Sequence, residues 1–399
     1  MAEDAFAVSY LRHDMRGAPV INGNTPGCMI AALDALLVTG WGPAAPQSLT
    51  VSAGVATATF ASATPWEVGA VIKISDATPE AINGKARVLS SSGNTLTFAT
   101  SASAGTYSGT IDIRYCPADW EKVFSATNKA VYRSKDPLGN RHYLRVDDGD
   151  VMRAKVCGYV SMSSIDTGTE CYPEDGRTGG GGFWVKSAGS GITGASPYLL
   201  AADSVFLVLC VARYVPYWGS GRSVSDIRGF GDFLSMSPIG DAYASGLSAT
   251  TTVPASSAYG SLAGSIGQND SLGVCALPRG FGAEVGCVHV RTFPLTGREG
   301  DISGDSNLLG ICPSPVSGKV ILSRVAIRSE GYNGAVRAMI PGVFYIPQTG
   351  ALGSLGANFA INPGAGDVAD RQLATVHQAQ SVEATPVGVA LVDVTGPWR

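Results

Sequence analysis

Charged residues are scarce in this sequence, and neither a basic cluster nor a long apolar run stands out. Asp, Glu, Lys and Arg make up 15% of the 399 residues, and the formal net charge is −4. Because nucleic-acid-binding proteins concentrate Lys and Arg on one surface, nucleic acid is not an expected partner. The most apolar segment, Val205–Ala212, is far shorter than the roughly 20 residues that cross a bilayer, so membrane insertion is not expected.

Catalytic motifs are missing as well. The sequence contains no GxSxG nucleophile elbow, no HExxH, no P-loop and no GxGxxG between a strand and a helix. Among the 4 histidines, His142 and His289 lie in strand-like segments, where a histidine is usually a satisfied or half-exposed strand residue. We therefore predict no catalytic, metal-binding or cofactor-binding residues and no enzymatic activity.

Two acidic clusters are the nearest approach to a site. One spans Asp147–Asp150, and in the other, residues 301–307, oxygen-bearing side chains alternate as at the start of a calcium loop. Ser306 stands where an EF-hand needs Gly, and the later Glu is missing, so a solvated loop is favoured. A glycosidase would need two carboxylates roughly 5 to 10 Å apart, and the sequence leaves open whether any two meet.

Cysteine is present without the spacing of a metal site. None of the 8 cysteines forms a CxxC pair or sits beside a His at ligand spacing, and several lie in apolar surroundings. These features favour free core thiols in a protein that folds in reducing cytoplasm. Disulfides remain the alternative if the protein later meets an oxidising exterior. Residues 1–17 lack an apolar leader, so no secretory signal is expected.

What the sequence does contain begins with one clear helical pattern. Thr25 can cap a helix, Pro26 fits the first helical position, apolar residues recur every three or four positions, and Gly40 can close the end. These features predict a helix over residues 26–39, within an N-terminal segment of residues 1–45. We expect it to pack across an open face of the main sheet or to contact a neighbouring subunit.

The rest of the chain has the composition of an all-β protein. Short alternating runs separated by turn residues fill residues 46–115 and predict a small inserted β-barrel or sandwich module, with Val51, Thr57 and Phe60 feeding its core. Residues 116–399 then predict a main β domain of sandwich or barrel type. Its two long apolar runs, Ser204–Ala212 and Val320–Arg328, are expected to be central strands.

Several segments carry a further indication. They are "PADWEKVFSATNKAVYRS", "YLRVDDGD", "RGFGDFLSMSPIGDAYA" and "VALVDVTGPWR", together with "SLTVSAGVATATFASATPWEVGAVIKISDATPEAINGKARV" in the small module. The first four resemble parts of a family of virion structural proteins of tailed bacteriophages and prophages. The last resembles the small β module of several phage proteins of this kind. Together these segments cover about two thirds of the chain, and the family supplies no established active residues.

The resemblance implies a virion component, more specifically of the tail, neck or baseplate, that folds in the host cytoplasm before assembly. Its expected partners are other virion proteins and copies of itself. A second hypothesis is a module that binds host-surface carbohydrate, and a third is an enzyme such as a polysaccharide depolymerase. The candidate interface or glycan-contact aromatic residues are Tyr214, Tyr217, Trp218 and Trp184, although a core position is an equally good interpretation of each Trp.

Overall fold

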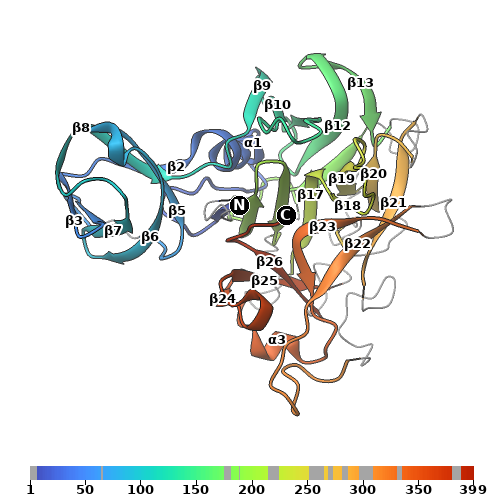
Figure 1. Cartoon of the computed structure of the whole chain (residues 1–399). Coiled ribbons are helices and arrows are strands. Elements are labelled where there is room, and N and C mark those ends of the chain that lie inside the picture. The colour runs from blue at the N-terminus through green and yellow to red at the C-terminus, as the bar shows by residue number, and fades with distance from the viewer. Residues whose placement is uncertain are drawn as a thin grey trace.

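The protein is mainly β, with one short N-terminal helix and a closed six-stranded barrel beside a large sheet (Figure 1). This confirms the fold class predicted from the sequence. The computed structural model describes residues 7–63, 66–174, 181–187, 189–213, 224–250, 265–267, 273–280, 286–295, 309–329, 335–379 and 388–399.

The N-terminal helix lies close to its predicted position but begins differently. Helix α1 (Cys28–Asp34) continues directly into a π-helical turn, η1 (Ala35–Thr39), and Gly40 follows with φ of 72° as a closing glycine. The predicted cap is wrong, because α1 has no side-chain cap from its own N-terminal flank. Asp148 replaces it from the main domain: the N–H groups of Met29 and Ile30 donate to its Oδ2 at 2.8 and 3.2 Å.

The small module is a closed barrel with an additional edge strand. The strands are β2 (Trp41–Ala44), β3 (Ser48–Ser52), β4 (Val55–Thr59), β5 (Val71–Thr78), β6 (Gly84–Ser92), β7 (Thr95–Ala99) and β8 (Gly105–Tyr115), with the 3-10 turn η2 (Glu80–Ile82) between β5 and β6. The barrel closes because β8 pairs with both β3 and β5.

Alternation along the strands fills the barrel interior. Strand β3 buries Leu49 and Val51, and β4 buries its alanines, while the intervening Ser and Thr face outward. The expectation for Thr57 is therefore wrong. Thr57 lies between Ala56 and Ala58 on β4, so its side chain points to the outer surface instead of the core.

The main domain is built from antiparallel strands joined into one extended pairing system in the described part of the chain. The strands are β1 (Ser9–Arg12), β9 (Glu121–Ala126), β10 (Lys129–Arg133), β11 (Tyr143–Asp147), β12 (Arg153–Ser164), β13 (Thr167–Tyr172), β14 (Gly182–Val185), β15 (Tyr198–Ala202), β16 (Phe206–Val211), β17 (Asp226–Asp232), β18 (Leu234–Ser235), β19 (Ser245–Thr250), β20 (Gly273–Leu277), β21 (Val288–Pro294), β22 (Ser323–Ser329), β23 (Val336–Tyr345), β24 (Ile361–Pro363), β25 (Gln372–Gln378) and β26 (Gly388–Asp393).

Both long apolar runs contain central strands, as predicted, although residues 320–322 of the second run precede its strand. Every residue of β16 is buried, and the strand pairs with β15 on one side and β17 on the other. Strand β22 likewise lies between β21 and β23. The short helix α3 (Ala351–Ser354) and the 3-10 turn η4 (Gly366–Val368) lie in the lower part of the domain, near β24 to β26 (Figure 1).

Hydrogen bonds and a ring stack fix the barrel to the main domain. Where the chain leaves the barrel, the N–H groups of Ala118 and Trp120 donate to the carbonyls of Leu36 and Leu37 in η1, each at 2.8 Å. At the barrel's base, the rings of Trp41 and Tyr115 stack with centroids 4.9 Å apart. The barrel therefore continues the packing of the helix and does not hang from a free linker.

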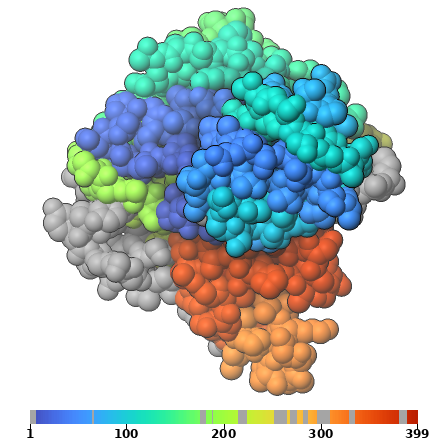
Figure 2. All heavy atoms as spheres, turned by 90° about the vertical axis from the view of Figure 1, so that its left-hand side faces the viewer, coloured from blue at the N-terminus to red at the C-terminus, as the bar shows by residue number. Residues whose placement is uncertain are grey.

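A second set of contacts joins the barrel to the N-terminal segment and to the C-terminal strands. Arg16 donates to the carbonyls of Gly42 and Pro43 and lies over the ring of Trp66, 5.4 Å from its centroid. On the barrel's lower side, a Cβ added at Gly69 would lie 2.9 Å from Nε2 of Gln372 in β25. Figure 2 shows the barrel, in blue, resting against the C-terminal part of the chain, in red.

Arg16 gives a direct test of this joint. We expect Arg16→Ala to lower the free energy of unfolding by about 1–2 kcal/mol, because it removes two hydrogen bonds and a cation–π contact. Hydrogen exchange should accelerate at residues 40–44 and leave the amides inside the barrel protected. The matched control is Lys73→Ala on the exposed surface of β5. Equal exchange at residues 40–44 in both variants would show that Arg16 does not hold the joint.

Candidate functional site

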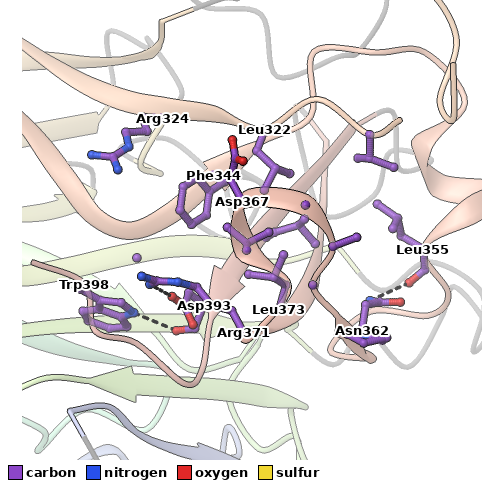
Figure 3. A pocket seen from close by; sticks show the side chains of 18 of the residues that line it. Leu322, Arg324, Phe344, Leu355, Asn362, Asp367, Arg371, Leu373, Asp393 and Trp398 are labelled. Atoms are coloured by element: carbon purple, nitrogen blue, oxygen red, sulfur yellow. Dashed lines mark hydrogen bonds and ion pairs between the residues drawn. The ribbon is translucent and has the colours of Figure 1, made fainter. Parts of the chain in front are cut away.

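A surface cleft of about 940 Å³ opens in the lower part of the main domain (Figure 3). Its walls come mainly from parts of residues 318–324, 340–344, 362–368 and 391–399. These segments include the approach to β22, the middle of β23, the glycine-rich connection from β24 through η4, and the C-terminal residues. The volume lies at the upper end of the 300–1,000 Å³ typical of ligand pockets.

The floor of the cleft is an apolar cluster separate from the main core. Its buried members include Leu373 and Leu391, on the neighbouring strands β25 and β26. Half-buried apolar side chains that line the cleft pack against them: Val320, Leu322, Phe344, Leu355 and Val368. Because these side chains keep part of their surface in water, a ligand that covers them would gain hydrophobic free energy.

Gly342 allows one wall of the cleft to form. Its φ of 66° lies in the left-handed region, and an added Cβ would lie 2.3 Å from Cε2 of Trp398. The indole of Trp398 therefore packs directly on the backbone of β23, and its Nε1–H donates to the carbonyl of Asp393 at 3.0 Å. Glycine at position 342 thus permits the left-handed backbone and leaves the space for the ring.

The charged lining of the cleft is mainly positive. It consists of the cations Lys319, Arg324, Arg371 and Arg399 and the anions Asp367 and Asp393. These side chains sum to a formal charge of +2, because four cations face two anions, whereas the whole chain carries −4. Asp203 lies outside the lining but pairs with Arg399, which lowers this sum to +1, because four cations then face three anions. The cleft is therefore modestly positive on an acidic protein.

Two of these cations are held by buried carboxylates. Nη1 of Arg371 lies 2.6 Å from Oδ2 of Asp393, and Nε of Arg399 lies 2.9 Å from Oδ2 of Asp203. Figure 3 shows the guanidinium of Arg371 directed at Asp393, while Arg324 lies away from this pair. Lys319 and Arg324 are exposed, and within the described ranges no ion pair joins either of them. These two cations are available to a ligand.

Of the aromatic residues predicted as contact sites, Trp184 lies in the described part of the chain, and it does not line this cleft. Trp184 is fully buried in β14, between β12 and β19, and its indole donates to the carbonyl of Ser248 at 2.8 Å. The core interpretation therefore applies to Trp184, because no face of its ring can reach a partner. Tyr214, Tyr217 and Trp218 lie outside the described residues.

The first acidic cluster has a structural role at its centre. Asp148 is fully buried, caps α1 and pairs with the equally buried Lys186 of the segment after β14. Burial raises the pKa of the Asp148 carboxyl although Lys186 opposes that shift. Asp147 and Asp150 instead pair with basic side chains nearer the surface. The second acidic cluster, residues 301–307, lies outside the described residues.

The histidines are placed by packing and hydrogen bonds. His142 is 6% exposed, its Nδ1 lies 3.2 Å from the hydroxyl of Tyr172, and burial lowers its pKa to about 4. Nε2 of His377 lies 3.0 Å from the carbonyl of Gly356, and burial also lowers its pKa. In the described ranges, no group of three or more His, Cys, Asp or Glu side chains is arranged to hold a metal ion.

No disulfide joins cysteines of the described ranges, and most of these cysteines are buried. Burial raises the pKa of several, including Cys210 and Cys275, which lie inside the sheet. This agrees with the expectation of core thiols. No helix in the described part of the chain is both long and apolar enough to cross a membrane.

Sequence reasoning missed the cleft because its residues come from distant parts of the chain. Lys319 and Arg324 flank the run "VILS", which was interpreted only as the start of a central strand. The available signal was the pair of cations beside an apolar run, followed about 40 residues later by the glycine-rich "NPGAGD". Neither feature alone predicts a cleft.

Fold and cleft together define a mainly β protein with a small closed barrel, a capped helix and a basic, apolar-floored surface groove. No protein-family model matches the chain, and no curated protein sequence matches it at a significant level.

Proposed function

We propose that this chain is a structural component of a tailed-bacteriophage virion, associated with the tail, neck or baseplate. It would act through contacts with other virion proteins and with copies of itself, after folding in the host cytoplasm. The sequence segments that resemble phage virion proteins support this proposal, and the low content of charged residues suits surfaces that become covered in subunit contacts.

The structural observation that carries the proposal is the fixed joint between barrel and main domain. Subunits of a symmetric assembly repeat the same contacts, so each must present its surfaces in a constant relative orientation. Here Ala118 and Trp120 bind η1 through their backbones, and Arg16 binds the barrel's base. The barrel can therefore act as a rigid projection that contacts a neighbour while the main domain contacts another.

Host-surface carbohydrate binding is the second candidate, and no described contact favours it at present. Trp184 is buried, and of the two aromatic residues that line the cleft, Phe344 is half-buried and Trp398 is buried, whereas a sugar ring prefers a flat exposed aromatic face. Glycan binding by the purified chain is therefore measured together with its presence in particles.

The test is to locate the chain in purified particles. Mass spectrometry of particles from the phage or prophage that encodes the chain should detect it at a constant ratio to the other virion proteins. Antibody or gold labelling of an epitope tag should mark one position on the tail, neck or baseplate. Intact, infectious particles that lack the chain would refute the proposal. Binding of the purified chain to host glycan, with none to virion proteins, would establish the second candidate instead.

A further inference from the structure

We propose that the cleft binds an extended acidic peptide segment with apolar side chains, supplied by a neighbouring protein of the particle. This proposal rests on the function proposed above and specifies the chemistry of one contact. Three features of the cleft support this occupant: its apolar floor, its exposed cations and its exposed backbone.

The floor selects for aliphatic and aromatic side chains. Leu322, Phe344 and Leu355 are half-buried on top of the buried pair Leu373 and Leu391. These side chains already pack on one another, so a ligand side chain added above them extends an existing apolar layer. Such a layer suits Leu, Val or Phe from a peptide better than the hydroxyl-bearing edges of a sugar.

The charge selects for acidic residues next to those apolar side chains. Lys319 and Arg324 are the exposed cations of the cleft, whereas Arg371 is committed to the buried Asp393. Arginine binds carboxylates through paired hydrogen bonds, and charge complementarity of this kind raises both association rate and specificity. Asp367 is also exposed in the cleft and carries the opposite charge. It therefore limits the site to ligands whose carboxylates lie toward Lys319 and Arg324.

The glycines leave backbone groups open to a bound peptide. At Gly318 and Gly366, an added Cβ would meet no heavy atom within 4 Å. The backbone at both positions is therefore uncovered on that side. The N–H of Gly318 already donates to Ser314 and the carbonyl of Gly366 accepts from Ala369, so the groups left for a bound peptide are the carbonyl of Gly318 and the N–H of Gly366.

The experiment uses the full chain and a defined probe. The probe is a fluorescein-labelled peptide of four Asp-Leu repeats, and the comparison peptides have four Lys-Leu or four Asp-Ser repeats. Fluorescence anisotropy should show that the Asp-Leu peptide binds about tenfold more tightly than either comparison peptide. Only this peptide supplies both apolar side chains for the floor and carboxylates for the two exposed cations. Equal binding of the Asp-Leu and Asp-Ser peptides would overturn the proposal.

Charge reversal in the cleft provides the second arm. In the double variant Lys319→Glu/Arg324→Glu, affinity for the Asp-Leu peptide should fall about tenfold, while affinity for the Lys-Leu peptide should rise. The rise cannot result from misfolding. The matched control is Lys73→Glu/Lys85→Glu on exposed positions of the barrel, which changes the net charge equally and should leave binding unchanged.

Two results would separate this proposal from the proposed function. If particles contain the chain but the double variant binds all peptides like the wild type, the peptide site is refuted and the structural role stands. If a host glycan competes for binding and the same two substitutions abolish its binding, the occupant is carbohydrate and the peptide proposal is wrong. Particle composition is measured independently of both.

Discussion

Asp148→Asn should lower the free energy of unfolding by about 3–5 kcal/mol. Asn keeps an oxygen that can accept from Met29 and Ile30, so the cap of α1 is retained. What is lost is the negative charge beside Lys186, whose side chain is fully buried. An uncompensated ammonium in that position carries a large desolvation cost. Urea unfolding at neutral pH measures the change.

Two further variants isolate the cause. In Asp148→Asn/Lys186→Met the buried charges disappear together, and we expect the free energy of unfolding to recover to within about 1–2 kcal/mol of the wild type. Asp147→Asn, at a 30% exposed side chain, should cost less than about 1 kcal/mol. A double variant no more stable than Asp148→Asn would refute the charge explanation.

Acid should destabilise the protein through His142. Burial lowers its pKa from the ordinary 6.5 to about 4, so below pH 6.5 the unfolded chain binds a proton that the folded protein does not. Stability from this residue is therefore fully present above pH 6.5 and falls as the pH decreases toward 4. A difference of about 2.5 pKa units corresponds to about 3 kcal/mol.

His142→Asn serves as the non-titrating reference, because an amide can replace the contact of Nδ1 with Tyr172. Other acid-sensitive groups remain in both proteins, so the difference between their stabilities isolates His142. We expect the advantage of the wild type over the variant to shrink by about 3 kcal/mol between pH 7 and pH 4. A difference that stays constant over this range would contradict the prediction.

Local patterns in the sequence were sufficient to predict several of the strands and the closing of the helix. The alternation of β3 and the unbroken apolar run of β16 each reflect the faces that those strands bury. Gly40 could be identified because a single left-handed residue ends the helix. In each case, the determining interactions lie within a few residues of one another.

The beginning of the helix and the cleft depend on contacts between distant residues. The cap of α1 comes from Asp148, about 120 positions after the N–H groups that it binds. Thr25 and Pro26 match the local rule for a helix start, but the buried carboxylate takes their place because Lys186 holds it there. Trp184 is a candidate for surface contacts or for the core by sequence alone, and only the pairing of β14 with β12 and β19 explains its burial.

The barrel begins and ends at one point on the main domain. Trp41 and Tyr115 face each other across β2 and β8, and a Cβ at Gly40 would lie 2.3 Å from the carbonyl oxygen of Tyr115. A short bridge could therefore replace the whole module without displacing η1 or β9. In an evolving lineage, this geometry lets a different appendage be exchanged at the same place while the remaining scaffold keeps its shape.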